Sequence, residues 1–167
     1  GNVSTVAFMM GSAFKSFSYN RHVSSNLLNS IIAPNGISRQ YTYDEHRDLI
    51  TSINDKRGAT QVVNRNYVYD KLWRPITCTY ARQGTVRNDT FTHNKRSELS
   101  LARVNGKEYD YSYDNIGNRQ QSTEDNTITA YSSNALNQYI GLCENEENNF
   151  IPEFDSDGNQ TLIKTST

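Results

Sequence analysis

The sequence predicts an all-β protein: a single antiparallel sheet of serial β-hairpins, curved or spiral, and open rather than closed. Three observations support this fold class. A short aromatic motif recurs along the 167 residues, turn-forming residues separate its copies, and β-branched and aromatic residues dominate the intervening segments. No long run of Ala, Leu, Glu and Lys favours helices instead.

Each copy of the motif has an aromatic residue, any residue, an aromatic residue or His, and then Asp or Asn, which we call the marker residue. The seven marker residues follow one another at intervals of 24, 26, 24, 20, 20 and 21 residues. Four copies are degenerate, and two of these keep only part of the pattern. The motif residues are Phe17, Tyr19 and Asn20; Tyr41, Tyr43 and Asp44; Tyr67, Tyr69 and Asp70; Phe91, His93 and Asn94; Tyr111, Tyr113, Asp114 and Gly117; Tyr131 and Asn134; and Phe154, Asp155 and Gly158.

One unit of the repeat has a simple physical interpretation. Aromatic residues two positions apart lie on the same face of a strand. The marker carboxylate or amide can accept a hydrogen bond from the backbone two residues on, and Gly117 and Gly158 tolerate the positive φ of a reversing chain. Further turn signals at Asn35-Gly36, Gly84 and Asn105-Gly106 divide the units, so each reads as two strands and two turns. Isolated hairpins are marginal in water, so the units must lie side by side with their aromatic rings stacked in a ladder.

The elements follow in order along the chain. Residues 1–16 are an N-terminal flank, residues 17–162 are the repeat array as a single domain, and residues 163–167 are a C-terminal tail. Leu27, Leu28, Ile31 and Ile32 have the spacing of one helical face, but the segment is short and a strand fits equally well. Strands are expected at residues 49–53, 61–63 and 76–80, which are rich in β-branched residues.

Composition excludes several classes of protein. The formal net charge of -1 supplies no electrostatic reason to expect nucleic acid or an anionic membrane as partner. No apolar run approaches the roughly 18 residues of a membrane span. The 11 Tyr and 6 Phe argue against disorder and assign much of the burial to tyrosine. The two cysteines, Cys78 and Cys143, allow one disulfide at most and are expected to be free thiols.

Catalytic and metal-binding motifs are matched only in part. Residues 46–49 read His-Arg-Asp-Leu, the start of a kinase catalytic loop, but Ile53 stands where that loop requires Asn. Residues 155–159 resemble a calcium loop with a misplaced Gly and no distal Glu. Cys78 and His93 have no third residue to orient them as nucleophile and base. We therefore predict that the chain is not an enzyme and has no catalytic residue, metal site or cofactor.

The Tyr-Asp pairs at Tyr43-Asp44, Tyr69-Asp70 and Tyr113-Asp114 resemble those of the Rhs or YD-repeat family. Each tetrapeptide alone is a weak signal, whereas seven in series are a strong one. The resemblance extends over residues 17–162. Further segments that look like those of the family are residues 41–53, 96–99, 113–119, 134–139 and 154–161.

The resemblance implies an antiparallel β-sheet that, in full-length members, forms a shell around a C-terminal toxin or effector. Because 167 residues are too few to close a shell, enclosure would be the role of a longer bacterial parent that is secreted or displayed at the cell surface. The leading hypothesis is thus a non-catalytic structural segment. Its implied partners are the remaining repeats and the C-terminal domain of the parent, and self-association through the unpaired sheet edges is also expected.

A carbohydrate-binding or cell-surface adhesion module is the alternative, since exposed tyrosines beside Asn and Asp suit stacking on sugars. Exposure of the rings discriminates the two hypotheses. Tyrosines packed against the protein indicate a scaffold, whereas two or more exposed rings flanked by amides indicate a glycan site.

Overall fold

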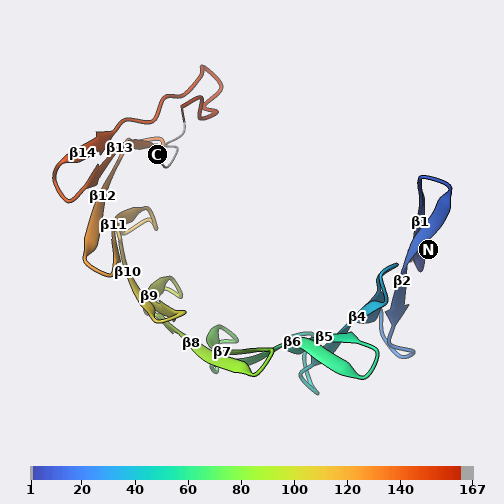
Figure 1. The fold of residues 1–167 in the computed structure, drawn as a ribbon. Helices are drawn as coiled ribbons and strands as arrows, with labels where there is room; N and C mark the ends of the chain where they lie inside the picture. The colour runs from blue at the N-terminus through green and yellow to red at the C-terminus, as the bar shows by residue number, and fades with distance from the viewer. Residues whose placement is uncertain (1, 163–167) are drawn as a thin grey trace. The chain divides into compact units, whose positions relative to one another are not determined.

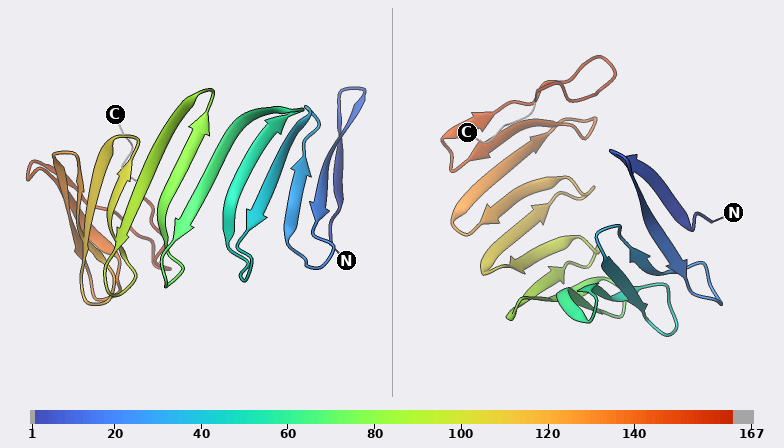
Figure 2. Two further views of the ribbon diagram at one scale, coloured as in Figure 1. Left: turned by 90° about the horizontal axis from the view of Figure 1, so that it is seen from below. Right: turned by 45° about the vertical axis from the view of Figure 1, so that its right-hand side comes forward.

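The computed structural model describes residues 2–162 and is an all-β structure, as predicted. Fourteen strands form one antiparallel sheet, in which each strand pairs with its neighbours in the sequence (Figures 1 and 2). Among the described residues, β1 and β14 have one neighbour each, so the sheet is open rather than closed. The strands are β1 (Thr5–Met10), β2 (Ala13–Arg21), β3 (Leu28–Ile32), β4 (Ile37–Tyr43), β5 (Ile50–Arg57), β6 (Thr60–Tyr69), β7 (Pro75–Arg82), β8 (Thr85–His93), β9 (Leu99–Val104), β10 (Lys107–Tyr113), β11 (Arg119–Glu124), β12 (Thr127–Ser133), β13 (Tyr139–Glu144) and β14 (Asn148–Phe150).

The chain forms two compact units, one up to Asp89 and one from Thr90 onward. Two kinds of turn alternate in both units. Short turns follow the odd-numbered strands, from β1–β2 to β13–β14. An example is Asn105-Gly106 between β9 and β10, where φ is 54° and 80°. The marker residues instead begin the longer turns that join β4 to β5, β6 to β7, β8 to β9, β10 to β11 and β12 to β13. Each unit of the sequence repeat is therefore two strands and two turns.

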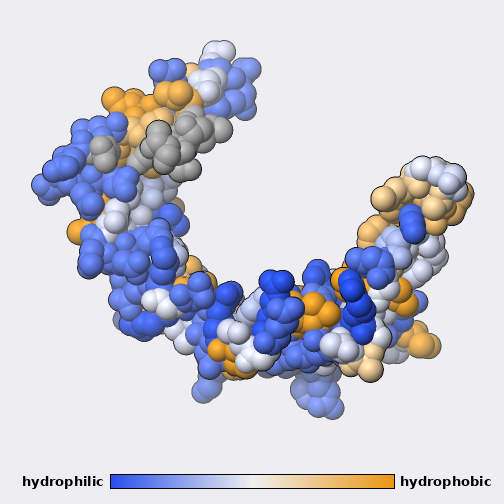
Figure 3. All heavy atoms as spheres, in the orientation of Figure 1, coloured by the Kyte–Doolittle hydropathy of each residue, from blue (hydrophilic) through white to orange (hydrophobic). Residues whose placement is uncertain are grey.

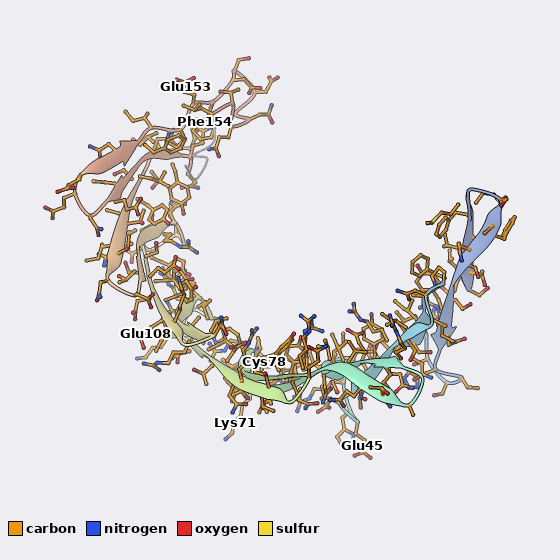
Figure 4. The ribbon with its side chains drawn as sticks, viewed as in Figure 1. Glu45, Lys71, Cys78, Glu108, Glu153 and Phe154 are labelled. Atoms are coloured by element: carbon orange, nitrogen blue, oxygen red, sulfur yellow. The ribbon has the colours of Figure 1, made fainter. Side chains whose placement is uncertain are left out.

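Register divides the side chains between two unlike faces of the sheet. Residues paired across neighbouring strands share a face, so Tyr67 lies beside Cys78, and Phe91 lies beside Ala102. The opposite face pairs polar residues, for example Asn66 with Thr79. We call the two surfaces the aromatic face and the polar face. In Figure 4, the side chain of Cys78 projects from the ribbon of the first unit on the aromatic face.

Burial is shallow on both faces. Among the described residues, the buried apolar ones are Ala102 and Pro152, and no large side chain is fully buried. Most residues of the aromatic face are half-buried, because a single sheet has no second layer to cover it. Stability must therefore come from neighbour-to-neighbour contacts along the sheet rather than from a central core.

The structure decides the elements that the sequence left open. The ambiguous segment around Leu28 is a strand, β3, because it pairs with β2 and β4. The expected N-terminal flank contains β1, which forms a hairpin with β2. The expected tail at residues 163–167 lies outside the described residues. Within residues 2–162, no helix is long and apolar enough to cross a membrane.

Candidate functional site

The marker turns are the most regular constellation of side chains in the structure. In the turn that begins at Asp114, the Asp114 N–H donates to the carbonyl of Asn118 at 2.9 Å, and the Gly117 N–H donates to the carbonyl of Asp114 at 3.4 Å. Asp114 Oδ1 accepts hydrogen bonds from the N–H groups of Ile116 and Asn118, each at 2.9 Å. One carboxylate oxygen thus holds two backbone donors that the turn would otherwise leave without partners.

The predicted hydrogen bond from the backbone two residues on is present at six marker residues. In each, the marker Oδ1 accepts from an N–H at 2.8–3.0 Å. The marker residues are Asp44, Asp70, Asn94, Asp114, Asn134 and Asp155.

The first copy differs from this pattern. Asn20 lies inside β2, where its Nδ2 donates to Ser30 Oγ at 3.0 Å. The turn begins two residues later, at His22, whose N–H donates to the carbonyl of Leu27 at 3.0 Å. The register irregularity that falls between Thr42 and Tyr43 before Asp44 falls between Asn20 and Arg21 in the first copy, so His22 takes the place in the turn that the marker takes in the other copies.

A second side chain, four residues after the marker, completes five of the six turns. Where the marker is Asp, this residue donates: Arg74 Nε to Asp70 at 2.7 Å and Asn118 Nδ2 to Asp114 at 2.9 Å. Asn159 Nδ2 likewise donates to Asp155 at 3.0 Å. In the turn that begins at Asp44, the fourth residue is Asp48, and Arg47 Nε instead approaches Asp44 Oδ1 at 3.8 Å.

Where the marker is Asn, the direction of this bond is reversed. Asn94 Nδ2 donates to Glu98 Oε2 at 2.6 Å, and Asn134 Nδ2 donates to Gln138 Oε1 at 2.9 Å. The sequence analysis missed these five partners. Their signal is the type of residue four positions after the marker, which is a donor after Asp70, Asp114 and Asp155 and an acceptor after Asn94 and Asn134.

In the same five turns, the third residue after the marker has a left-handed backbone. Gly117 and Gly158 have φ of 95° and 83°, which confirms the prediction for these two glycines. The same conformation occurs at Trp73, Ser97 and Asn137, with φ of 67°, 68° and 61°. Trp and Ser carry a backbone strain there that glycine avoids, so the closing hydrogen bonds must overcome it.

Charge is concentrated in these turns. The Arg74 guanidinium, together with backbone N–H groups, lowers the pKa of Asp70 below its ordinary value. Desolvation alone would raise the pKa of Asp114, but the hydrogen bonds from Asn118 and the turn backbone outweigh it and lower the pKa. The side chain and backbone of Asn159 likewise lower the pKa of Asp155. These carboxylates are thus held ionised as hydrogen-bond acceptors.

Successive turns also contact one another. The Arg47 guanidinium lies 4.4 Å from the ring centroid of Trp73, in the next turn along the sheet. In the second unit, Arg96 Nη2 donates to the carbonyl of Asp114 at 2.5 Å, and Asn118 Nδ2 donates to Asn137 Oδ1 at 3.1 Å. The turns therefore link neighbouring hairpins at one end of the strands.

The tyrosine that precedes the marker links strands on the aromatic face. The hydroxyls of Tyr43 and Tyr69 donate to the carbonyls of Leu28 and Ile50 at 2.8 and 2.7 Å. Tyr113 donates in the same way to Leu99 at 2.9 Å. Burial raises the pKa of Tyr43 and of Tyr69, and keeps both phenols protonated as donors.

Arginines lie between the aromatic rings. Arg119 stacks between Tyr111 and Tyr131, with guanidinium-to-centroid distances of 4.5 and 5.7 Å. Arg87 and Arg65 lie 4.5 and 5.4 Å from the ring of Tyr80. The planar guanidinium extends the stack where two rings do not meet directly.

A buried carboxylate lies on the same face in the first unit. Asp55 is 8% exposed and accepts two hydrogen bonds from Arg39, at 2.6 and 2.9 Å. Arg65 approaches the same carboxylate at 3.7 Å. The hydrogen bond from Arg39 lowers the pKa of Asp55 despite its burial. The group pairs charges across β4, β5 and β6 and offers no free carboxylate for chemistry.

The cysteines are the thiols of the described residues. Cys78 and Cys143 are free thiols. Burial, followed by the charge of Asp89, raises the pKa of Cys78, which makes it a poor nucleophile at neutral pH. In the part of the chain that the structure describes, no three His, Cys, Asp or Glu side chains are grouped to hold a metal ion.

No protein-family model matches the chain, and no curated protein matches it either. Solved structures do. The crystal structure of TcdB2-TccC3 without its hypervariable C-terminal region is 10% identical, with a TM-score of 0.53 over 89% of this chain and 10% of that chain. The Photorhabdus luminescens Tc holotoxin pore is also 10% identical, with a TM-score of 0.50 over 83% of this chain and 9% of that chain. The protein thus shares the fold of a stretch of these toxin chains, and spans about a tenth of their length.

Proposed function

We propose that the chain is a non-catalytic wall segment of an Rhs or YD-repeat protein, part of a β-shell that encloses a toxin or effector polypeptide. The observation that carries the proposal is that the polar groups of the repeat motif form hydrogen bonds within the sheet itself. Marker side chains close turns, and the hydroxyls of Tyr43, Tyr69 and Tyr113 bond to backbone carbonyls within the sheet. A motif whose polar groups are satisfied internally builds a surface rather than a reaction centre.

The fold likeness supports the same proposal. The matched chains belong to Tc toxin assemblies, and this chain corresponds to about a tenth of each. A segment of that size is expected to work with the remaining repeats and the C-terminal domain of a longer parent. We place the parent outside the bacterial cell, secreted or at the cell surface.

The geometry favours the scaffold over a glycan-binding module. The rings of the tyrosine ladder are half-buried, and those of Tyr111 and Tyr131 are stacked with Arg119 rather than open to a ligand. Trp73 is 52% exposed, but the Arg47 guanidinium lies against its ring. A glycan array with the 167-residue protein is expected to show no binding; specific binding would favour the adhesion module.

Protease protection in the parent protein tests the enclosure directly. The reading frame that carries this chain is expected to continue into further repeats and a C-terminal effector domain. In the purified parent, that effector should resist a protease that digests the isolated domain within minutes. Equal digestion of the enclosed and isolated effector would contradict the proposal. Deletion of one hairpin, β10 with β11, gives the matched control, since an opened wall should remove the protection.

A further inference from the structure

The aromatic face of the first unit carries more positive than negative charge. Register places Arg39, Arg65 and Arg82 on this face. Arg87 joins them, because its guanidinium lies 4.5 Å from the ring centroid of Tyr80. We call these four arginines the arginine patch. The whole chain has a formal net charge of -1, so the composition does not reveal this local concentration of positive charge.

Two carboxylates lie among these arginines, and both are largely covered. The side chains of Asp55 and Asp89 are 12% and 7% exposed, whereas those of Arg39 and Arg87 are 44% and 39% exposed. Arg82 is exposed, and none of the ion pairs within residues 2–162 includes it. The other acidic residues of this unit lie in the marker turns. Solvent therefore meets mainly guanidinium groups on this part of the aromatic face.

An apolar hollow adjoins the arginine patch. It has a volume of about 390 Å³ and is lined by Phe17, Ile31 and Ile37 together with Arg39 and Asp55, among others. Its walls come from β2 to β6, so neither end strand of the sheet is needed to form it. In Figure 3, strongly hydrophilic and hydrophobic residues lie side by side on the part of the first unit that contains β4 to β6.

We propose that the arginine patch and the adjoining hollow bind an acidic polypeptide segment. An apolar side chain of the segment would enter the hollow, and its carboxylates would accept hydrogen bonds from the guanidinium groups. The pair of Arg39 and Asp55 already has this geometry within the protein, with two hydrogen bonds at 2.6 and 2.9 Å. Carboxylates from a partner would balance the positive charge that the buried acids leave uncompensated.

The spacing of the arginines suits an extended chain that crosses the strands. Arg39 and Arg82 lie in one row of paired residues on β4 and β7. Three strand spacings of about 4.8 Å separate them by about 14 Å, and side chains four residues apart in an extended peptide span about 13 Å.

A nucleic acid fits this surface less well. The Tyr80 ring is half-buried and already has Arg65 and Arg87 at 5.4 and 4.5 Å, so it does not offer an open face on which a base could stack. The inference stands on the register and the charges of the first unit, and it is independent of the proposed wall function.

Fluorescence anisotropy with a short labelled peptide tests the proposal. The peptide has one Leu followed by two Glu four residues apart, in a background of Ser and Gly. It should bind the 167-residue protein, and the binding should weaken as salt is added. A peptide with Gln in place of both Glu should bind at least about tenfold more weakly. A peptide with Ser in place of Leu should also lose affinity, because the hollow would stay empty.

Arg82→Gln locates the site, because Arg82 is exposed and its loss breaks no ion pair within residues 2–162. Lys71→Gln is the matched control. It changes the net charge equally, but Lys71 lies in a marker turn and projects from the ribbon on the side opposite to Cys78 (Figure 4). Arg82→Gln should raise the dissociation constant at least about threefold and leave the melting temperature unchanged, whereas Lys71→Gln should leave the dissociation constant unchanged.

Three results would overturn the proposal. The first is no binding of the Glu peptide at millimolar concentration, or equal binding of the Gln peptide. The second is an equal loss of affinity in Lys71→Gln and Arg82→Gln, because the attraction would then come from overall charge. The third is tighter binding of a single-stranded oligonucleotide with the same charge as the peptide, because the site would then select phosphates over carboxylates.

Discussion

The turn at residues 134–138 allows a direct test of side-chain complementarity. Asn134 Nδ2 donates to Gln138 Oε1 at 2.9 Å. Asn134→Asp should be tolerated, because the Gln138 amide can rotate and donate as Asn118 does to Asp114. Gln138→Glu should be tolerated too, because Asn134 can donate to it as Asn94 does to Glu98. Each single variant is expected to lie within about 0.5 kcal/mol of the native free energy of unfolding.

The double variant removes the donor altogether. Two carboxylates at the present 2.9 Å would repel by about 1.4 kcal/mol in a water-like dielectric, and loss of the hydrogen bond costs about 1 kcal/mol more. Relaxation of the two side chains will reduce this total, so we expect the double variant to be destabilised by about 2 kcal/mol. Nearly all of this loss should be coupling free energy between positions 134 and 138, because each single variant is nearly neutral.

Urea unfolding followed by far-UV circular dichroism measures the four proteins of this double-mutant cycle. The loss of stability in the double variant should shrink as pH falls through the folded-state pKa of one carboxyl, which the repulsion raises, and should be gone below the unfolded-state pKa of about 4, because protonation restores a donor. A coupling energy near zero, or a single variant as unstable as the double one, would refute the complementarity. A deficit that does not change with pH would show that repulsion is not its cause.

Three further predictions concern single positions. Gly117→Val should lower the free energy of unfolding by about 1–3 kcal/mol, because φ is 95° there, and an unchanged melting temperature would refute the turn assignment. Tyr69→Phe should cost about 1 kcal/mol by urea unfolding, because the Ile50 carbonyl loses its 2.7 Å donor; a neutral result would mean that water replaces the hydroxyl without loss. Arg74 lowers the pKa of Asp70, so the contribution of Asp70 to stability is present above its unfolded-state pKa and is lost as pH falls through its folded-state pKa. Asp70→Asn should therefore reduce the loss of stability at acid pH. A pH–stability profile identical to that of the native protein would contradict the pairing.

The local rules of the repeat were readable in the sequence. The two-residue period of a strand, the turn-forming marker and the glycines at 117 and 158 predict hairpins without any tertiary information, and the structure has them. The bond from the marker to the backbone two residues on is equally local, so it was predictable at Asp44 as at Asp155. Short-range sterics and hydrogen bonding suffice for such features, because all the atoms involved lie within a few residues of one another.

Contacts between strands depend on register, and a pattern within one strand does not specify register. Only the tertiary structure decided that Leu28 lies in a strand, that the first turn begins at His22 rather than Asn20, and that Arg47 packs on Trp73. It also decided which carbonyls accept the tyrosine hydroxyls. These outcomes depend on which strands lie side by side, so the sequence by itself determined the repeating hairpin, and the assembled sheet determined what each hairpin contacts.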